Sequence, residues 1–218
     1  MSNWHAEVRK PEWSDMEYQI RCWPQFVWTS GDNFVEMVIH NVDILNWAMR
    51  KTPERAIGVG GHVNWEDWPV KGNVYDHIYV EFDYGKGVRM SASGRQIKNT
   101  FSRVGERIVG TKGFATPTIG QIEGEKPYKY DGAFPNPREI QHRAFVESIR
   151  GGRPLNEGKQ LAEATATVIL GRTAAYTGRM LNYSWVLEES QLDLRPPKFE
   201  FGPLPVSPLA IPGKTEPL

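Results

Sequence analysis

The sequence contains a single cysteine, Cys22, among its 218 residues. One cysteine excludes an internal disulfide and a zinc site built from several cysteines. No apolar stretch approaches the roughly 20 residues that a membrane-spanning helix needs. Lysine plus arginine and aspartate plus glutamate both number 26, so the net charge is zero. Because no overall charge attracts nucleic acid or an anionic membrane, we expect neither as a partner.

The first residues, MSNWHAEVRKPEW, also lack the basic and then apolar pattern of a signal peptide. We therefore expect a cytoplasmic protein, or a periplasmic one if a signal segment lies upstream. Residues 1–30 hold four tryptophans and two prolines without a regular period. We interpret this segment as an irregular approach to the main domain, with a short helix over 15–23 capped by Ser14.

Residues 31–51, GDNFVEMVIHNVDILNWAMRK, predict the central helix of the chain. Apolar residues fall on nearly every side of it, and a helix that is apolar all round is a buried one. Asp32 or Asn33 can cap its start, and Pro53 ends it.

The polar residues of this helix fall on one stripe. Glu36, His40 and Asp43 are spaced i, i+4 and i+7, so they share one helix face. Polar groups are costly to bury without partners, so the stripe should be paired, ligated or catalytic. A core histidine held by a neighbouring carboxylate explains the pattern equally well. A metal site would need further ligands, such as His77, Asp76 or His142, which nothing in the sequence places nearby, so we expect no metal.

After Pro53 the apolar pattern changes to a period of two, which indicates strands. Strands are predicted over 55–64, 73–84 and 88–97, with a hairpin turn at 85–87. Further strands are predicted over 101–109, 114–122 and 126–130, and we expect them to continue the same, mostly antiparallel sheet. One sheet face is apolar. The other carries polar residues and would suit solvent, a subunit interface or a binding surface: Tyr75, His77, Tyr79, Arg89, Ser91, Ser93 and Arg95.

Two further helices are predicted over 137–150 and 157–181, the second rich in small residues that allow close packing. Seven prolines beyond Leu194 predict an extended tail that lies along its own domain or along a partner. We therefore divide the chain into an approach segment (1–30), a substrate-binding and oligomerisation domain (31–194) and a proline-rich tail (195–218). The fold class is α/β (α+β), a large, mostly antiparallel open sheet with helices on one face.

A dinucleotide site is not predicted. Gly58-Val59-Gly60-Gly61 resembles the start of a glycine loop, but Val63 occupies the third glycine position and no helix opens there. Pyrophosphate binding needs the strand, the glycine turn and the helix N-terminus together. The chain therefore lacks a recognisable Rossmann unit.

Three motifs follow one another from residue 31 onward: Gly31-Asp32, Glu36-x3-His40-Asn41-x-Asp43-x3-Trp47 and Ala56-x-Gly58-x-Gly60-Gly61. Together they resemble the C-terminal domain of the Gfo/Idh/MocA oxidoreductases. More specifically, they resemble a bacterial branch with a tryptophan-rich stretch before an EQHxHNxD-type helix. The resemblance continues in order almost to the end of the chain, through 72–77, 87–95, 109–113, 169–172 and 192–194.

The resemblance implies an NAD(P)-dependent oxidoreductase acting on a sugar, cyclitol or related polyol. His40 matches the family's catalytic histidine, and Glu36 stands where many members have aspartate. Asp43, Asp76, His77 and Arg95 are the expected substrate contacts, and a homo-oligomer would form through the open sheet face. The family binds NAD or NADP mainly through an N-terminal Rossmann domain, with a catalytic lysine in an E-K-P segment. Glu125-Lys126-Pro127 has those letters but lies late in the sheet region, which we interpret as coincidence.

Because the nucleotide half is missing, we expect the chain to be inactive alone and to meet a Rossmann domain in cis or in trans. One alternative is a non-catalytic carbohydrate-binding or scaffold subunit. Another is a metal-dependent lyase or isomerase built on the Glu36–His40–Asp43 stripe.

Overall fold

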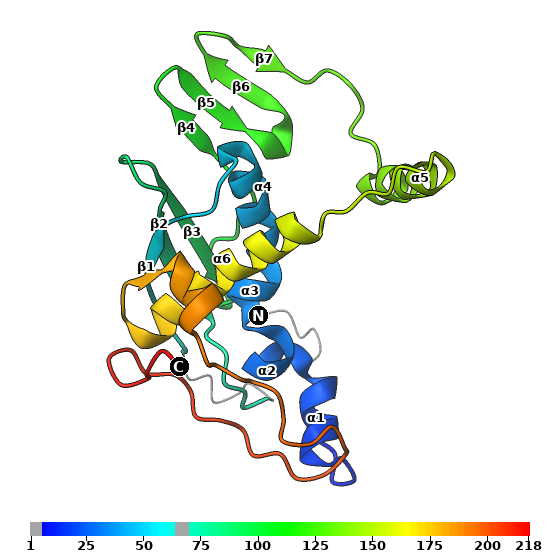
Figure 1. The fold of residues 1–218 in the computed structure, drawn as a ribbon. Helices are drawn as coiled ribbons and strands as arrows, with labels where there is room; N and C mark the ends of the chain where they lie inside the picture. The colour runs from blue at the N-terminus through cyan, green and yellow to red at the C-terminus, as the bar shows by residue number, and fades with distance from the viewer. Residues whose placement is uncertain (1–5, 64–69) are drawn as a thin grey trace. The chain divides into compact units, whose positions relative to one another are not determined.

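Figure 1 shows the computed structural model of the chain, which describes residues 6–63 and 70–218. The chain divides into two units. The first comprises residues 1–101 and 163–218, and the second comprises residues 102–162. The three-part functional division made from the sequence stays a prediction.

The first unit opens with short helices: α1 (Asp15–Arg21), η1 (Trp23–Gln25), α2 (Val27–Ser30), α3 (Asn33–Met37) and α4 (Ile39–Met49). The predicted cap of α1 is confirmed, since the Ser14 hydroxyl oxygen accepts a hydrogen bond from the Glu17 N–H at 3.2 Å. Tyr18, Cys22 and Phe26 pack with Trp13 and Val70 in a small core of their own.

An antiparallel sheet forms the centre of the first unit, in the order β3-β2-β1-β8. Its strands are β1 (Arg55–Gly61), β2 (His77–Asp83), β3 (Arg89–Arg95) and β8 (Leu181–Asn182). The predicted hairpin between β2 and β3 is confirmed, and Gly85 and Gly87 have positive φ angles there. The position predicted for Tyr75 on the outer face is wrong. Tyr75 precedes β2, so the alternation of that strand does not include it, and its ring is buried against Tyr176.

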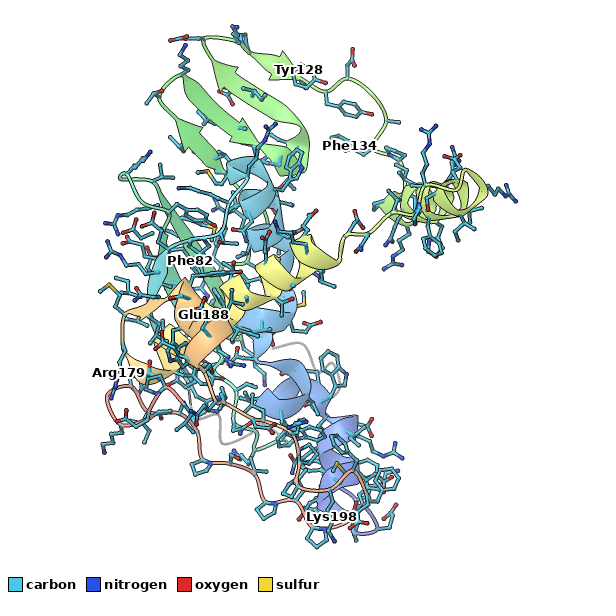
Figure 2. All side chains as sticks on the ribbon, viewed as in Figure 1. Phe82, Tyr128, Phe134, Arg179, Glu188 and Lys198 are labelled. Carbon is cyan, nitrogen blue, oxygen red and sulfur yellow. The ribbon has the colours of Figure 1, made fainter. Side chains whose placement is uncertain are left out.

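Helices cover one face of this sheet, as predicted. The inward side chains of Ile78, Val80 and Phe82 are buried, and α6 (Gly158–Thr177) packs on them through its residues from 163 onward. A Cβ atom at Gly171 would lie 2.6 Å from Cζ of Phe82, which Figure 2 labels. The predicted close packing of the small-residue helix is therefore confirmed.

The central helix predicted over 31–51 is wrong in two respects. It is interrupted at Val38, between α3 and α4, and it is not buried all round: Trp47 is 71% exposed and Met37 46% exposed. The helices lie on a sheet, so only one side of them is covered. That side carries the buried residues, spaced four apart: Phe34, Val38, Val42 and Asn46.

The second unit has its own antiparallel sheet, in the order β4-β5-β6-β7. Its elements are β4 (Ile108–Gly110), β5 (Gly113–Thr116), η2 (Pro117–Ile119), β6 (Gln121–Gly124), β7 (Tyr128–Lys129) and α5 (Pro137–Arg150). The bounds predicted for α5 are confirmed. These strands do not continue the first sheet, as the sequence suggested, because alternation indicates a strand but not its pairing partner. None of residues 102–162, all of which the structure describes, is buried.

After η3 (Trp185–Glu189), the proline-rich tail runs along the first unit (Figure 1). The Leu204 N–H donates to Asp15 at 3.0 Å, and the Tyr75 hydroxyl donates to the Ala210 carbonyl at 2.8 Å. Further along, the Gly213 N–H donates to the Thr177 carbonyl at 2.8 Å, and Arg179 pairs with Glu216 at 2.6 Å. The sequence predicted that the tail lies along its own domain or along a partner, and the structure shows it along its own domain. The α+β fold class, an open antiparallel sheet with helices on one face, is confirmed.

Candidate active site

The predicted catalytic stripe lies on the open side of α3 and α4. Glu36 and Asp43 are half-buried, and His40 is exposed. The helical path continues through the interruption, because the Val38 N–H donates to Phe34 at 3.2 Å and the Val42 N–H donates to Val38 at 3.0 Å. The three residues therefore keep the common face that their spacing predicted. A buried histidine held by a carboxylate, the alternative from the sequence, is not what the structure shows.

Neither the Glu36 nor the His40 side chain makes a hydrogen bond or ion pair with another residue in the described part of the chain. An exposed imidazole next to a carboxylate one turn away can donate or accept a proton at a bound hydroxyl group. Glu36 and His40 are thus accessible to a ligand and are not occupied by structural bonds among the described residues.

A buried polar cluster lies where α3 begins, and sequence reasoning recognised only its helix cap. Asp32, 1% exposed, accepts hydrogen bonds from the Phe34 N–H at 3.0 Å, from the Tyr75 N–H at 2.8 Å and from the Tyr176 hydroxyl. Burial raises the pKa of Asp32 above its usual value, while these three donors and the charge of Arg172 act in the opposite direction.

Two tyrosines enclose Asp32. The rings of Tyr75 and Tyr176 lie 4.4 Å apart between centroids. Burial, with the nearby Asp32 charge, raises the pKa of Tyr75 to about 12 and raises the pKa of Tyr176 well above its usual value. Both phenols therefore stay protonated and act as donors at neutral pH.

Arg172 completes the cluster from α6. It is buried, and its Nη1 donates to the Gly31 carbonyl at 3.2 Å. Its guanidinium carbon lies 5.8 Å from the Tyr176 ring centroid. Burial lowers the pKa of Arg172. One signal in the sequence could have revealed this cluster. Arg172 and Tyr176 lie four residues apart, and so on one face, of a helix of mostly small apolar residues, where large polar side chains need partners.

A second predicted group lies at the start of β2. The Asp76 carboxylate is buried and accepts hydrogen bonds from Nδ1 of His77 and from the Val63 N–H, both at 2.6 Å. His77 is half-exposed, and its partner across the strands is Arg95, which is exposed and donates to the Phe101 carbonyl at 2.7 Å. Because Asp76 accepts from Nδ1, the Nε2 atom of His77 remains available to a ligand.

The predicted site residues thus fall into two groups. A Cβ atom at Gly94 would lie 3.1 Å from Cγ2 of Val38, which places the α3–α4 junction on the inner face of the sheet. His77 and Arg95 alternate with inward residues and lie on the outer face. The structure therefore separates His77 and Arg95 from Glu36, His40 and Asp43. The functional roles of these five residues and of Asp76 stay predictions.

The glycines of 58–61 lie within or at the end of β1 and serve packing. A Cβ atom at Gly58 would lie 2.9 Å from the backbone nitrogen of Ala175, and one at Gly60 would lie 2.6 Å from the His77 carbonyl oxygen. Residues 6–63 and 70–218 contain no parallel strand–glycine turn–helix unit, since both sheets are antiparallel. The described residues therefore do not form a Rossmann-type site for a nicotinamide dinucleotide.

The described residues offer neither a cluster of metal ligands nor a membrane-spanning helix. They contain no group of three or more His, Cys, Asp or Glu side chains placed to hold a metal ion. In the same part of the chain, no helix is long and apolar enough to cross a membrane.

Comparison with known proteins gives matches among solved structures only. No protein-family model matches the chain, and no curated protein sequence matches it. UDP-N-acetylglucosamine 3-dehydrogenase GnnA from Acidithiobacillus ferrooxidans is similar with a TM-score of 0.53 at 17% identity, over 67% of this chain and 48% of that one. Myo-inositol 2-dehydrogenase from Lactobacillus plantarum is similar with a TM-score of 0.53 at 16% identity, over 70% of this chain and 49% of that one.

A third similar structure is an oxidoreductase from Agrobacterium radiobacter in complex with NAD+, L-tartaric acid and magnesium. Its TM-score is 0.53 at 14% identity, over 81% of this chain and 58% of that one. The chain shares the fold of part of these oxidoreductases. It spans about half the length of the first two, and the likeness agrees with the resemblance to a Gfo/Idh/MocA C-terminal domain.

Proposed function

We propose that the chain is the substrate-binding and oligomerisation half of an NAD(P)-dependent oxidoreductase acting on a sugar, cyclitol or related polyol. The observation that carries this proposal is the shared fold with half of two dehydrogenases, one of a nucleotide sugar and one of an inositol. The accessible Glu36 and His40 side chains support it, because with Asp43 on the same helix face they offer proton-transfer and hydroxyl-binding groups together.

In this proposal His40 is the general acid/base at the reacting hydroxyl group. A neutral imidazole takes the hydroxyl proton as the carbinol carbon is oxidised, and returns it in the reverse direction. Glu36, one turn earlier, orients the imidazole, and Asp43, one turn later, binds a neighbouring substrate hydroxyl group. NAD or NADP would supply the hydride acceptor from a Rossmann domain in cis or in trans, so the chain alone should not catalyse the reaction.

The outer face of the first sheet is the proposed oligomer interface. Ile57, Val59 and Tyr79 form an exposed apolar row there, 47%, 65% and 45% exposed. Ion pairs flank the row, Arg55 with Asp83 and Arg89 with Glu81. An apolar centre with a charged rim is typical of a protein interface, and a second copy of this face is the proposed partner. His77 and Arg95 lie on the same face, where they would contact the partner copy or a ligand bound beside it.

Two binding measurements on the purified chain test the function. NADH titration, followed by NADH emission, should show no saturable binding. Titration with myo-inositol or UDP-N-acetylglucosamine, followed by NMR, should show binding that His40→Ala weakens at least tenfold. His142→Ala is the matched control, because His142 lies on α5 in the second unit and its Nδ1 contacts the Arg138 carbonyl.

The opposite results are equally informative. Saturable NADH binding, or NAD-dependent oxidation by the isolated chain, would show that the chain is not inactive alone. Polyol binding that His40→Ala leaves unchanged would favour the carbohydrate-binding or scaffold subunit. The lack of a nucleotide-binding unit in the described residues is the observation in favour of that second candidate.

A further inference from the structure

The first turn of α3 depends directly on Asp32. The Phe34 N–H donates to the Asp32 carboxylate at 3.0 Å, and the Glu36 N–H donates to the Asp32 backbone carbonyl at 3.0 Å. Glu36 is thus tied to Asp32 by the first backbone bond of the helix. A shift of Asp32 would therefore change the direction of the first turn of α3, which carries Glu36. It would also change the direction in which the helical chain continues to His40.

Asp32 is in turn held by residues outside the helix. Its second carboxylate oxygen accepts from the Tyr75 N–H at 2.8 Å and from the hydroxyl of Tyr176 on α6. The backbone of Asp32 has φ 90° and ψ 155°, a region that residues other than glycine rarely adopt. Such a conformation persists only where the surroundings fix it, so releasing the carboxylate should let the backbone relax.

Arg172 fixes the preceding residue in the same way. Its Nη1 donates to the Gly31 carbonyl at 3.2 Å, and it lies on α6 one turn before Tyr176. The buried helix α6 therefore holds both residues that precede α3. Asp32 and Arg172, which hold the start of the helix that carries the stripe, are thus almost completely shielded from water.

We propose that Asp32 and Tyr176 are positioning residues for the Glu36–His40 pair. The hydrogen bond between them connects α6 to the start of α3 and sets the orientation in which α3 presents Glu36 beside His40. What the pair does chemically rests on the proposed function, whereas the positioning itself can be measured without substrate.

The test is residue-resolved hydrogen exchange on the full chain, comparing Tyr176→Phe with Tyr75→Phe. Tyr176→Phe removes only the hydroxyl that donates to Asp32. Tyr75→Phe removes the hydroxyl that donates to Ala210 but keeps the Tyr75 N–H on Asp32, so it is the matched control. Tyr176→Phe should raise the exchange rates of the Phe34 and Glu36 amides by about tenfold or more, through local opening of α3.

The amides of Val80 and Phe82, in the central strand β2, distinguish positioning from general stability. If Tyr176→Phe only lowered the overall stability, exchange at the Val80 and Phe82 amides would accelerate in proportion to exchange at Phe34 and Glu36. If Tyr176 positions α3, exchange at Val80 and Phe82 should accelerate much less. Tyr176→Phe should also shift the amide NMR signals of Glu36 and His40, and Tyr75→Phe should not. Equal acceleration in β2 and α3, or no change at Phe34 and Glu36, would overturn the proposal.

If Tyr176→Phe does not fold, Asp32→Asn is the second variant. It keeps one side-chain oxygen but puts an amide N–H₂ group among three donors, and the same amides report the result. Myo-inositol binding to the unmodified chain is measured separately. Absence of that binding would count against the proposed function, while the exchange rates would still decide whether Asp32 and Tyr176 position α3.

Discussion

Replacing Asp32 by glycine or by alanine would separate the two contributions of this residue to stability. Both variants lose the carboxylate and leave the Phe34 N–H, the Tyr75 N–H and the Tyr176 hydroxyl without their acceptor. Loss of a helix cap costs about 1 kcal/mol. Each further buried donor left unpaired costs about 1–3 kcal/mol. These losses sum to about 3–7 kcal/mol. Because glycine also relieves the strain of about 1–2 kcal/mol that aspartate bears at this φ, we expect Asp32→Gly to lower the free energy of unfolding by about 1–6 kcal/mol.

Asp32→Ala should be less stable than Asp32→Gly. With φ at 90°, alanine bears the backbone strain of this position, whereas glycine adopts it freely. The difference between the two variants should be about 1–2 kcal/mol in favour of glycine. This order is the reverse of that expected at an ordinary helical position, where alanine is the more stabilising residue.

Urea unfolding followed by tryptophan fluorescence is the suitable assay. All eight tryptophans lie outside residues 102–162, so the signal reports the first unit without contribution from the second. A glycine variant as stable as the unmodified chain would refute the importance of the carboxylate bonds. An alanine variant as stable as the glycine variant would refute the strain at residue 32.

Three further predictions concern pH, packing and the stripe. Because burial raises the pKa of Asp32, its contribution to stability is fully present below the unfolded-state pKa of about 4 and is lost as the pH rises through the folded-state pKa. In urea unfolding, the stability of the unmodified chain relative to Asp32→Asn should therefore decline as the pH rises across this range. Gly171→Leu should prevent close packing of α6 on Phe82 and lower both the thermal midpoint and the free energy of unfolding. Phe82→Ala should lower the free energy of unfolding by about 3–5 kcal/mol, because it leaves a cavity. A loss below about 1 kcal/mol in either variant would contradict the packing. His40→Ala should change the free energy of unfolding by less than about 0.5 kcal/mol, because the exposed imidazole bonds to no described residue, and a larger loss would indicate a structural role.

Local patterns in the sequence predicted most of the individual elements. The Ser14 cap, the hairpin at 85–87 and the bounds of α5 depend on residues close together in the chain, and each is confirmed. The alternation in 77–83 and 89–95 correctly assigned the two faces of the first sheet, since side-chain direction in a strand has a period of two. The spacing of Glu36, His40 and Asp43 likewise determined their common face.

Contacts between distant residues decided what the sequence left open or misassigned. The sequence predicted strands over 101–109, 114–122 and 126–130, but only non-local pairing shows that 114–122 is divided between β5 and β6 and that these strands form a sheet apart from the first. The apolar helix 31–51 is covered on one side alone, because a sheet offers a single surface against which it can pack. The link from Tyr176 to Asp32 joins residues 144 positions apart, a distance over which neither periodicity nor motif spacing carries information. The sequence therefore determined most of the elements and the common helix face of Glu36, His40 and Asp43, and the tertiary structure determined how far that face is exposed and which buried residues hold the start of α3.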